Sequence, residues 1–404
     1  MRGPASGAPP QALVLDGNQR SALAVTRSLG RAGHSVAVAD ALENSVCSRS
    51  RYAHQEWTYP HPARFPHEFR EWLLQRGRAC PGTVLFACSD LTLPASQTAQ
   101  EVVGRGPWFA SCWPAQAAYE SLSDKWSLHL LAQRLAIPVP STRVLSISKD
   151  TASEAWSSRY PVVVKPRRSV QSVAGQRVKL SVVVAGSRGE LDARLREFPF
   201  ASDVLIQESV TGPGFGISAV CDSGNPIAWF AHRRIRELPP SGGVSTLCES
   251  IPIPSHHQRH CLALIDATRW HGPVMFEFKG DPNDAAVLIE VNGRLWGSLQ
   301  LAIHCGVDVP RLMFALAVGE RVAPAGSYAI GKRMRWLMGD LSHLYMVARR
   351  KRVPEPAPGR WRTAKRVLLS RDASRSTEDW AYGDIGPFWT QLRREFTARE
   401  VAGE

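Results

Sequence analysis

Two apolar segments that read as strands carry the side chains best suited to hold a metal ion. Glu277 lies within MFEFK, and Glu290 and Asn292 lie within LIEVNGR. Because side chains alternate along a strand, residues 290 and 292 project from one face, and Glu277 can face Glu290 if the two strands pair as a hairpin. Two carboxylates and an amide oxygen suit Mg²⁺ that bridges nucleotide phosphates, and Arg294 on the same face suits a phosphate or a carboxylate. The alternative interpretation is a strand face that meets only water.

Two lysines stand where a phosphate could be bound. The chain has 49 Lys and Arg residues, of which only eight are Lys. Lys165 ends the β-branched strand YPVVVKP, which Pro166 stops, and Lys125 opens a helix within SDKWSLHLL. A lysine at the end of a strand is a compact charge suited to phosphate oxygens, although each lysine alone also fits a solvated surface position.

The first 113 residues predict an open parallel sheet. QALVLDG and SVAVAD read as buried strands on either side of the helix SALAVTRSLGRAG, and TVLFACSD repeats a strand that ends in polar residues. The first loop has only Gly17 where a dinucleotide site needs GxGxxG, so this motif gives little support to a nicotinamide site. Residues 1–10, rich in Gly, Pro and Ala, predict a disordered tail.

From about residue 114 the pattern changes to one of mixed helix and antiparallel strand. A helix begins near SLSDKW and ends before Pro138. The strand candidates that follow are YPVVVKP, KLSVVVAGS, DVLIQES, GFGISAVCD, NPIAWFAH, PVMFEFKG and AAVLIEVNGR. Turn residues separate them, which predicts an antiparallel sheet within an α+β unit.

Composition excludes several classes of protein. In 404 residues, 44% are hydrophobic and 21% are charged, which is typical of a globular chain and not of a disordered one. No stretch approaches the roughly 18 apolar residues of a membrane span, and the N-terminus lacks the apolar region of a secretory signal. The eight cysteines form no CxxC pair, so we expect buried free thiols and a cytoplasmic protein.

The net charge of +13 is concentrated near the C-terminus. Residues 331–404 contain 16 Lys and Arg against 9 Asp and Glu, an excess of +7. No motif that reads nucleic acid accompanies this charge, so we expect no nucleic-acid partner. Within LSHLYMVARRKRV (341–353), apolar residues at helical spacing precede four consecutive basic residues. The segment fits either a helix docked on the core or a contact with an anionic surface.

These segments occur in an order and spacing that resembles the ATP-grasp ligases, over roughly residues 10–320. The resemblance rests on SDKWSLHLLAQRLAIPVPST, YPVVVKP, VLIQESVTGPG, MFEFKG and, most specifically, LIEVNGRLWGSLQLAIHCGVDVP. The gap of 13 residues between Glu277 and Glu290 is similar to that of D-alanine–D-alanine ligases. HRRIRELPPSGGVST resembles the substrate-side loop of these ligases, with Arg233, Arg236, Gly242 and Gly243 as its candidates; an exposed basic turn is the alternative.

The resemblance implies a role for each candidate residue. ATP phosphates would be bound by Lys125 and Lys165, adenine by Gln207, Glu208, Ser209 and Val210, and magnesium by Glu277, Glu290 and Asn292, with Arg294 near the transferred phosphate. Two departures affect the ribose contact and the lid. The loop RRSVQSVAGQ has one glycine where many members have several, and Gly214-Phe215-Gly216 occupies the place of an acidic ribose contact.

The resemblance also implies an architecture. A disordered tail (1–10) would precede a pre-ATP-grasp α/β domain with an open parallel sheet (11–113). The ATP-grasp domain (114–325), with its lid at about 141–210, would follow, and a basic C-terminal extension (326–404) would be appended to it.

The implied activity is that of an ATP-dependent carboxylate ligase that forms an acyl phosphate, which an amine then captures with release of ADP and phosphate. ATP and two Mg²⁺ ions would be required, Mn²⁺ being able to substitute, and the fold allows a homodimer. The alternatives are a carboxylase of the biotin carboxylase or carbamoyl phosphate synthetase type, and a non-catalytic nucleotide-binding regulatory or scaffold protein with a basic tail.

Overall fold

The computed structural model describes most of the chain. Its described residues are 10–104, 106–146, 159–173, 176–180, 182–198, 203–240, 242–349, 359–368 and 376–401. Residues 1–9 of the expected tail and the basic residues 350–352 lie outside these ranges.

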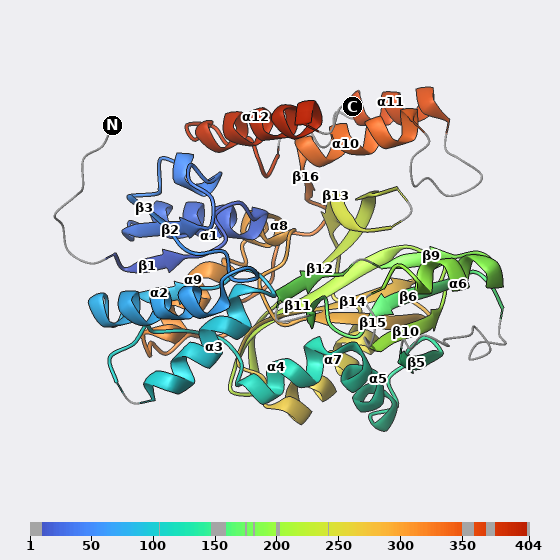
Figure 1. Cartoon of the computed structure of the whole chain (residues 1–404), viewed down its shortest axis with the longest axis horizontal. Coiled ribbons are helices and arrows are strands. Elements are labelled where there is room, and N and C mark those ends of the chain that lie inside the picture. The colour runs from blue at the N-terminus through green and yellow to red at the C-terminus, as the bar shows by residue number, and fades with distance from the viewer. Residues whose placement is uncertain are drawn as a thin grey trace.

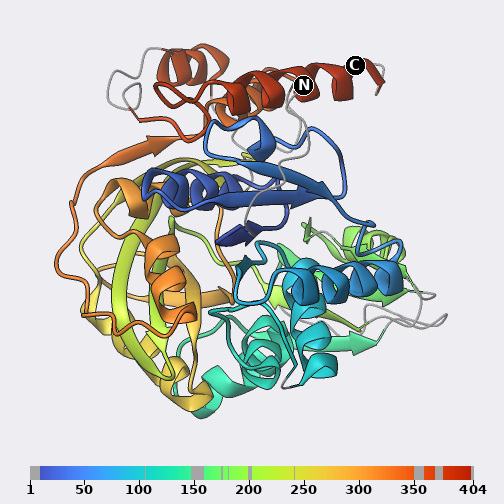
Figure 2. The same cartoon turned by 90° about the vertical axis from the view of Figure 1, so that its left-hand side faces the viewer.

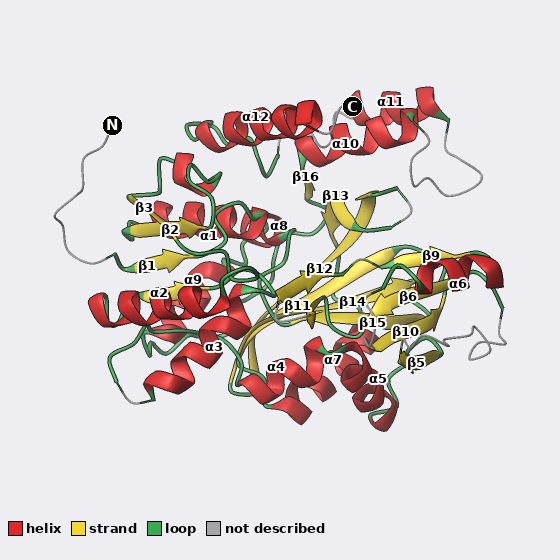
Figure 3. Ribbon diagram, viewed as in Figure 1, coloured by secondary structure: helices red, strands yellow, loops and turns green. Residues whose placement is uncertain are grey.

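The N-terminal residues form the open parallel sheet that the sequence predicts, with strand order β3-β2-β1-β4. The strands are β1 (Ala12–Val14), β2 (Val36–Asp40), β3 (Gln55–Thr58) and β4 (Val84–Phe86). Helix α1 (Arg20–Arg31) packs its apolar side chains on one face of the sheet. Helices α2 (Pro66–Ala79) and α3 (Thr92–Val103) cover the other face, as Figure 3 shows. Because both faces are covered, β1, β2 and β4 are almost entirely apolar, whereas the edge strand β3 (QEWT) is mostly polar.

A small antiparallel sheet with strand order β5-β10-β6-β9 follows. Its strands are β5 (Thr142–Ser146), β6 (Val162–Pro166), β9 (Val183–Ala185) and β10 (Asp203–Glu208). Alternate residues of β6 and β10, including Val164 and Ile206, form a small core with helix α6 (Arg188–Leu195). The separate hairpin β7 (Val170–Val173) and β8 (Gln176–Lys179) extends from the end of β6.

The largest sheet has six antiparallel strands in the order β15-β14-β11-β12-β13-β16. They are β11 (Gly214–Asp222), β12 (Asn225–Leu238), β13 (Val244–Ser250), β14 (Gly272–Gly280), β15 (Ala286–Asn292) and β16 (Arg333–Arg335). One face buries Phe276 and Phe278 against Leu264 of helix α7 (Ser255–Thr268). Helices α4 (Gln116–Ser123) and α5 (Lys125–Arg134) lie beside α7 in Figure 3. The opposite face carries apolar residues such as Met275 and Phe230, and also polar residues such as Glu277.

Helices α8 (Leu299–His304) and α9 (Val309–Ala317) follow the largest sheet and join it to the N-terminal one. Their apolar residues, including Leu299 and Met313, share a core with α1 and with Phe230 of β12. The two sheets therefore belong to one continuous apolar interior.

The C-terminal residues are tied to both sheets. Strand β16 pairs with β13, and α10 (Leu337–Ala348), α11 (Arg360–Leu368) and α12 (Gly386–Val401) form a layer along one side of the molecule (Figures 1 and 2). The buried guanidinium of Arg27 on α1 donates to Asp384 at 2.7 Å and to the carbonyl oxygen of Glu378 at 2.5 Å. Asp384 also accepts hydrogen bonds from Ser50 and from the backbone of Arg51. The residues expected as an appendage thus fasten the N-terminal sheet.

All eight cysteines are buried free thiols, as the sequence predicts. Among the described residues, no helix is long and apolar enough to cross a bilayer.

We expect Asp384→Ala to lower the free energy of unfolding by about 3–5 kcal/mol, because it leaves the Arg27 charge buried without its partner. Urea denaturation followed by circular dichroism measures this loss. The matched control is Glu197→Ala, which removes the exposed ion pair between Arg194 and Glu197 and should change stability by less than about 1 kcal/mol. Equal effects of the two variants would contradict the structural role of Asp384.

Candidate functional site

The hairpin of β14 and β15 brings the predicted acidic residues together. Glu277 lies directly opposite Glu290 in the register, and Asn292 lies opposite Met275 on the same hairpin. The Asn292 amide donates to Glu277 at 3.0 Å and approaches Glu290 at 3.5 Å. The pairing inferred from side-chain alternation is therefore present, and two carboxylates and one amide form a compact group.

An arginine that the sequence analysis passed over completes this group. Arg234 on β12 forms an ion pair with Glu277 and also donates to Glu237 at 3.2 Å and to the carbonyl oxygen of Gly243 at 3.0 Å. Its guanidinium neutralises one of the two buried carboxylates and links the hairpin to the loop after β12.

Glycines on β11 let side chains of β12 lie across that strand. A Cβ atom at Gly214 would lie 3.2 Å from Arg234, and one at Gly216 would lie 2.7 Å from the ring of His232. Strand β11 lies between β12 and β14, so Arg234 must cross it to reach Glu277. The Gly214-Phe215-Gly216 segment, noted in the sequence as a departure, supplies this space.

Lys165 is buried on the face of the small sheet that turns away from that sheet's own core. Its neighbours Val162 and Val164 face the core, whereas only 6% of Lys165 is exposed. Burial lowers the pKa of Lys165 to about 8, and the charges of Glu290 and Glu277 oppose that shift. The small sheet therefore directs Lys165 toward the acidic hairpin of the large sheet.

Lys125 is fixed at the start of α5 by the residue before it. Asp124 caps the helix by accepting from the backbone of Ser127 at 3.0 Å, and it also accepts from Arg167 at 2.7 Å. The Lys125 backbone donates to the carbonyl of Arg167 at 3.0 Å, and its amine lies 3.3 Å from the hydroxyl of Ser169. These contacts hold the lysine beside the end of β6.

The two glutamates differ in their protonation behaviour. Burial raises the pKa of Glu277 above its ordinary value, and the ion pair with Arg234 offsets this only in part. Burial also disfavours the charge of Glu290, but the nearby charges of Lys125 and Lys165 outweigh it and hold the pKa of Glu290 below its ordinary value. Glu290 is thus kept ionised by a concentration of positive charge.

Arg294 is bound by an acid of the N-terminal sheet. Its guanidinium donates to both carboxylate oxygens of Asp90 at 3.0 Å, and Tyr119 donates to the same carboxylate at 3.2 Å. Asp90 follows β4, where acidic residues at the carboxyl end of a parallel strand commonly reach a ligand site. That position is the signal that would have identified Asp90 from sequence.

A buried acid holds the loop that carries Asp90. Asp16 accepts hydrogen bonds from Thr92 at 2.5 Å, from Ser89 at 3.0 Å and from the backbone of Cys88 at 3.0 Å. Burial raises the pKa of Asp16 to about 6. The ends of β1 and β4 are fixed to each other in this way, and Asp90 is fixed with them.

The four residues expected to meet adenine lie at and beyond the end of β10. Gln207 is buried and donates to Thr142 at 2.9 Å, whereas the side chain of Glu208 is exposed. The backbone of Glu208 donates to the carbonyl of Ser141 at 2.9 Å. Ser209 and Val210 follow in the loop and are half-buried.

The residues of the expected substrate loop separate into two groups. Arg233 pairs with Glu249 of β13, and Arg236 pairs with the buried Asp340 of α10. Neither arginine contacts the acidic hairpin through these pairs. Gly243 accepts from Arg234, while Gly242 adopts a φ of +123°, which favours glycine. Among Arg233, Arg234 and Arg236, only Arg234 pairs with Glu277 in the described structure.

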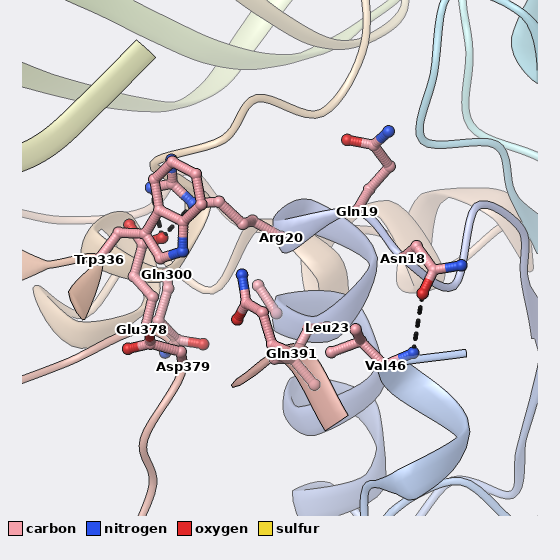
Figure 4. A pocket seen from close by; sticks show the side chains of 11 residues that line it. Asn18, Gln19, Arg20, Leu23, Val46, Gln300, Trp336, Glu378, Asp379 and Gln391 are labelled. Atoms are coloured by element: carbon pink, nitrogen blue, oxygen red, sulfur yellow. Dashed lines mark hydrogen bonds and ion pairs between the residues drawn. The ribbon is translucent and has the colours of Figure 1, made fainter. Parts of the chain in front are cut away.

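A separate small cavity lies where α1 meets the C-terminal layer (Figure 4). Its volume is about 10 Å³, roughly the space of one water molecule. The guanidinium of Arg20 lies 4.4 Å from the ring of Trp336 and donates to Glu378 at 2.5 Å. Burial raises the pKa of Glu378 to about 7. None of the residues predicted to bind nucleotide or metal lines this cavity.

The donor set of the hairpin fits Mg²⁺ in a particular way. The described residues contain no group of three or more His, Cys, Asp or Glu that would hold a metal alone. Mg²⁺ is commonly bound by one or two carboxylates together with substrate phosphates, and the lysines and arginines around the hairpin suit those phosphates. The arrangement can therefore bind a polyphosphate and a divalent cation together.

One family of proteins matches this region by sequence. A family model described as "ATP-grasp in the biosynthetic pathway with Ter operon" matches residues 200–339, a segment that contains Arg234 and the β14–β15 hairpin. Lys125 and Lys165 precede the matched segment. Among curated proteins, none matches the chain.

Solved structures match a much larger part of the chain. A biotin carboxylase–beta-gamma-ATP complex from Campylobacter jejuni has 16% identity and a TM-score of 0.59, covering 80% of this chain and 74% of its own. N5-carboxyaminoimidazole synthetase from Staphylococcus aureus, complexed with ADP, has 16% identity and a TM-score of 0.59. The match covers 81% of this chain and 82% of the synthetase. L-amino acid ligase from Bacillus licheniformis has 15% identity and a TM-score of 0.55. The match covers 78% of this chain and 75% of the ligase. At these identities the likeness is one of fold.

We expect Arg234→Met to destabilise the protein more as the pH rises. Without Arg234, the pKa of buried Glu277 rises further above the ordinary 4.5 of an unfolded glutamate, so the folded state retains a proton that the unfolded state loses. Stability is then lost as the pH rises through that interval. Urea denaturation at pH 5 and pH 8 should give the larger deficit relative to wild type at pH 8, about 3–5 kcal/mol.

Arg233→Met is the matched control, because the neighbouring arginine pairs with Glu249 instead. Its effect should not change between the two pH values. A deficit of Arg234→Met that is equal at pH 5 and pH 8 would refute the pairing of Arg234 with an ionised Glu277.

Proposed function

Because the chain belongs to the ATP-grasp superfamily, we propose that it is an ATP-dependent ligase that activates a carboxylate. The observation that carries this proposal is the opposition of Glu277 and Glu290 on one hairpin, with Lys165 buried within range of both charges. Burying so many charged groups is costly unless they are paired with one another or with a ligand. Bound Mg²⁺ and ATP would supply the missing partners.

In the proposed reaction, an oxygen of the substrate carboxylate attacks the γ-phosphorus of ATP. An O–P bond forms, the bond from the γ-phosphorus to the ADP oxygen breaks, and an acyl phosphate results. An amine then attacks the carbonyl carbon, so that a C–N bond forms, orthophosphate leaves and the amine proton passes to solvent. A Mg²⁺ ion held by Glu277, Glu290 and Asn292 would supply positive charge against the phosphates.

The chain's own residues would bind and orient the reactants. Glu277, Glu290 and Asn292 would hold Mg²⁺, and Lys125 and Lys165 would bind phosphate oxygens. Arg234 and Arg294 would neutralise the charge that develops on the transferred group. Arg234 also holds the carboxylate of Glu277 in place through their ion pair.

Nucleotide selection is assigned to the end of β10. The backbone of Gln207 to Val210 would meet adenine, with Glu208 beside it. The exposed side chain of Glu208 supports this proposal, because it is open to a ligand at the end of β10. We place the enzyme in the cytoplasm, since its eight cysteines are free thiols.

The proposed role of Lys165 can be tested by substitution. We expect Lys165→Ala to abolish ATP turnover without loss of folded stability, because burial already disfavours the charge of this lysine and lowers its pKa to about 8. ADP release measures the first effect and thermal unfolding the second. Lys332→Ala, which removes an exposed lysine, is the control and should turn over ATP like wild type.

The same lysine predicts a pH dependence of ATP binding. As the pH rises through about 8, Lys165 loses its proton, so ATP affinity should fall about tenfold between pH 7 and pH 9. Lys165→Arg keeps its charge and should flatten this profile. Full ATP turnover by Lys165→Ala would show that Lys165 does not bind ATP.

The proposed role of Glu290 as a metal ligand can also be tested by substitution. Glu290→Gln keeps the size of the side chain but removes one negative charge from the cation site, so turnover should fall by orders of magnitude. The Mg²⁺-dependent rise in melting temperature with ATP should also shrink, because a ligand bound to the folded state raises its apparent stability. Glu68→Gln, on the exposed face of α2, should leave both measurements unchanged.

The reaction class is tested with a panel of carboxylates and hydroxylamine, which traps an acyl phosphate as the hydroxamate. Hydroxamate together with ADP and orthophosphate is the expected result. Release of AMP and pyrophosphate would refute the acyl-phosphate route. ADP release that requires only bicarbonate would favour a carboxylase, and ATP binding without release of ADP for any carboxylate would favour a regulatory protein.

A further inference from the structure

Among the described Trp and Tyr residues, the exposed ones are confined to one region. The Trp and Tyr side chains classed as exposed are Trp361 (89%), Trp380 (45%), Tyr382 (103%) and Trp389 (49%). All four belong to α11, to α12 or to the segment 376–385 that precedes α12. Together with α10 these elements form what we call the C-terminal layer. The other described Trp and Tyr residues are at least partly buried.

The layer holds these aromatic residues outward on a rigid support. Asp384 is fixed to Arg27 and Ser50, and Thr377 donates to the carbonyl of Trp380 at 2.8 Å. Trp380 and Trp389 both contact Phe388, at ring distances of 5.2 and 5.4 Å. Trp380 and Trp389 are therefore held in place by packing against Phe388.

Charges in the layer are separated by sign. Between residues 331 and 394, the acidic side chains that the structure describes are all at least 95% buried: Asp340, Glu378, Asp379 and Asp384. Exposed basic side chains in the same span are Lys332, Arg349, Lys365, Arg366 and Arg393. Between residues 331 and 394, the described surface thus presents cations and aromatic rings, and the described acids of this span face inward to the fold.

We propose that the C-terminal layer binds an anionic membrane surface. Trp and Tyr partition to the boundary between headgroups and acyl chains, and Lys and Arg are attracted to anionic headgroups by about 1 kcal/mol each. Ile385 and Leu341, 45% and 38% exposed, add aliphatic surface that suits acyl chains. The binding is peripheral, since the described helices include none that could span a bilayer.

Two other occupants fit the surface less well. A second copy of the chain would bring two basic faces together, which like-charge repulsion opposes. Single-stranded nucleic acid requires a groove in which successive bases stack on rings, whereas aliphatic side chains such as Ile385 offer no stacking surface. In Figure 1 the layer lies along the top of the molecule, and the β14–β15 hairpin lies well below it within the largest sheet.

The test is sedimentation of the full chain with lipid vesicles. Wild type should sediment with phosphatidylcholine vesicles that contain about 30% phosphatidylglycerol, and not with phosphatidylcholine alone. About 0.5 M salt should weaken this binding, because it screens the charges. The double variant Trp361→Ser with Tyr382→Ser should bind about tenfold more weakly. Both side chains are almost fully exposed, so folded stability and ATP turnover should be unchanged.

The matched control is Leu42→Ser with Val102→Ser, which removes two exposed apolar side chains, 61% and 63% exposed, from the N-terminal part of the chain. It should bind vesicles like wild type. The proposal is overturned if wild type ignores anionic vesicles at low salt or if the double variant binds them normally. It is also overturned if the double substitution converts a wild-type dimer to a monomer, or weakens single-stranded DNA binding while vesicle binding persists. None of these outcomes depends on ATP turnover, so the proposed ligase activity is tested separately.

Discussion

Two half-buried carboxylates that face each other on β14 and β15 carry negative charge that the surrounding side chains have to balance. Burial alone would favour protonation of both, and the pKa of Glu277 is indeed raised. Glu290 remains ionised because cations from separate parts of the chain surround it: Lys125 from α5, Lys165 from the small sheet and Arg234 from β12. The small and large sheets must therefore approach each other for Glu290 to stay charged, whereas Glu277 depends mainly on Arg234.

Local patterns allowed much of this site to be predicted. Alternation along two apolar strands was enough to place Glu277 opposite Glu290, and a lysine at the end of a β-branched strand indicated Lys165. Arg234 was missed because three arginines occur within HRRIRE and sequence does not give the phase of the strand. The register of β12 also shifts between Arg234 and Arg236, so no simple alternation would have selected the correct arginine.

Contacts between distant residues were beyond prediction from one sequence. Arg294 and Asp90 are 204 residues apart, and no local pattern indicates that the N-terminal sheet supplies the partner of an arginine beside the hairpin. Charge counting likewise revealed the basic excess after residue 331 without showing its distribution. Only the folded chain separates the buried acids such as Asp340 from exposed lysines such as Lys365, and this separation turns a modest net charge into a strongly basic surface.

The contact between Arg27 and Asp384 also has a consequence for synthesis on the ribosome. These residues are 357 positions apart, so the N-terminal sheet emerges long before the carboxylate that pairs with Arg27 exists. During that interval α1 carries an unpaired guanidinium at a place that is later sealed, and the nascent sheet stays open to solvent on that side. Native closure of the first domain therefore has to wait until Asp384 has been translated, 357 residues after Arg27.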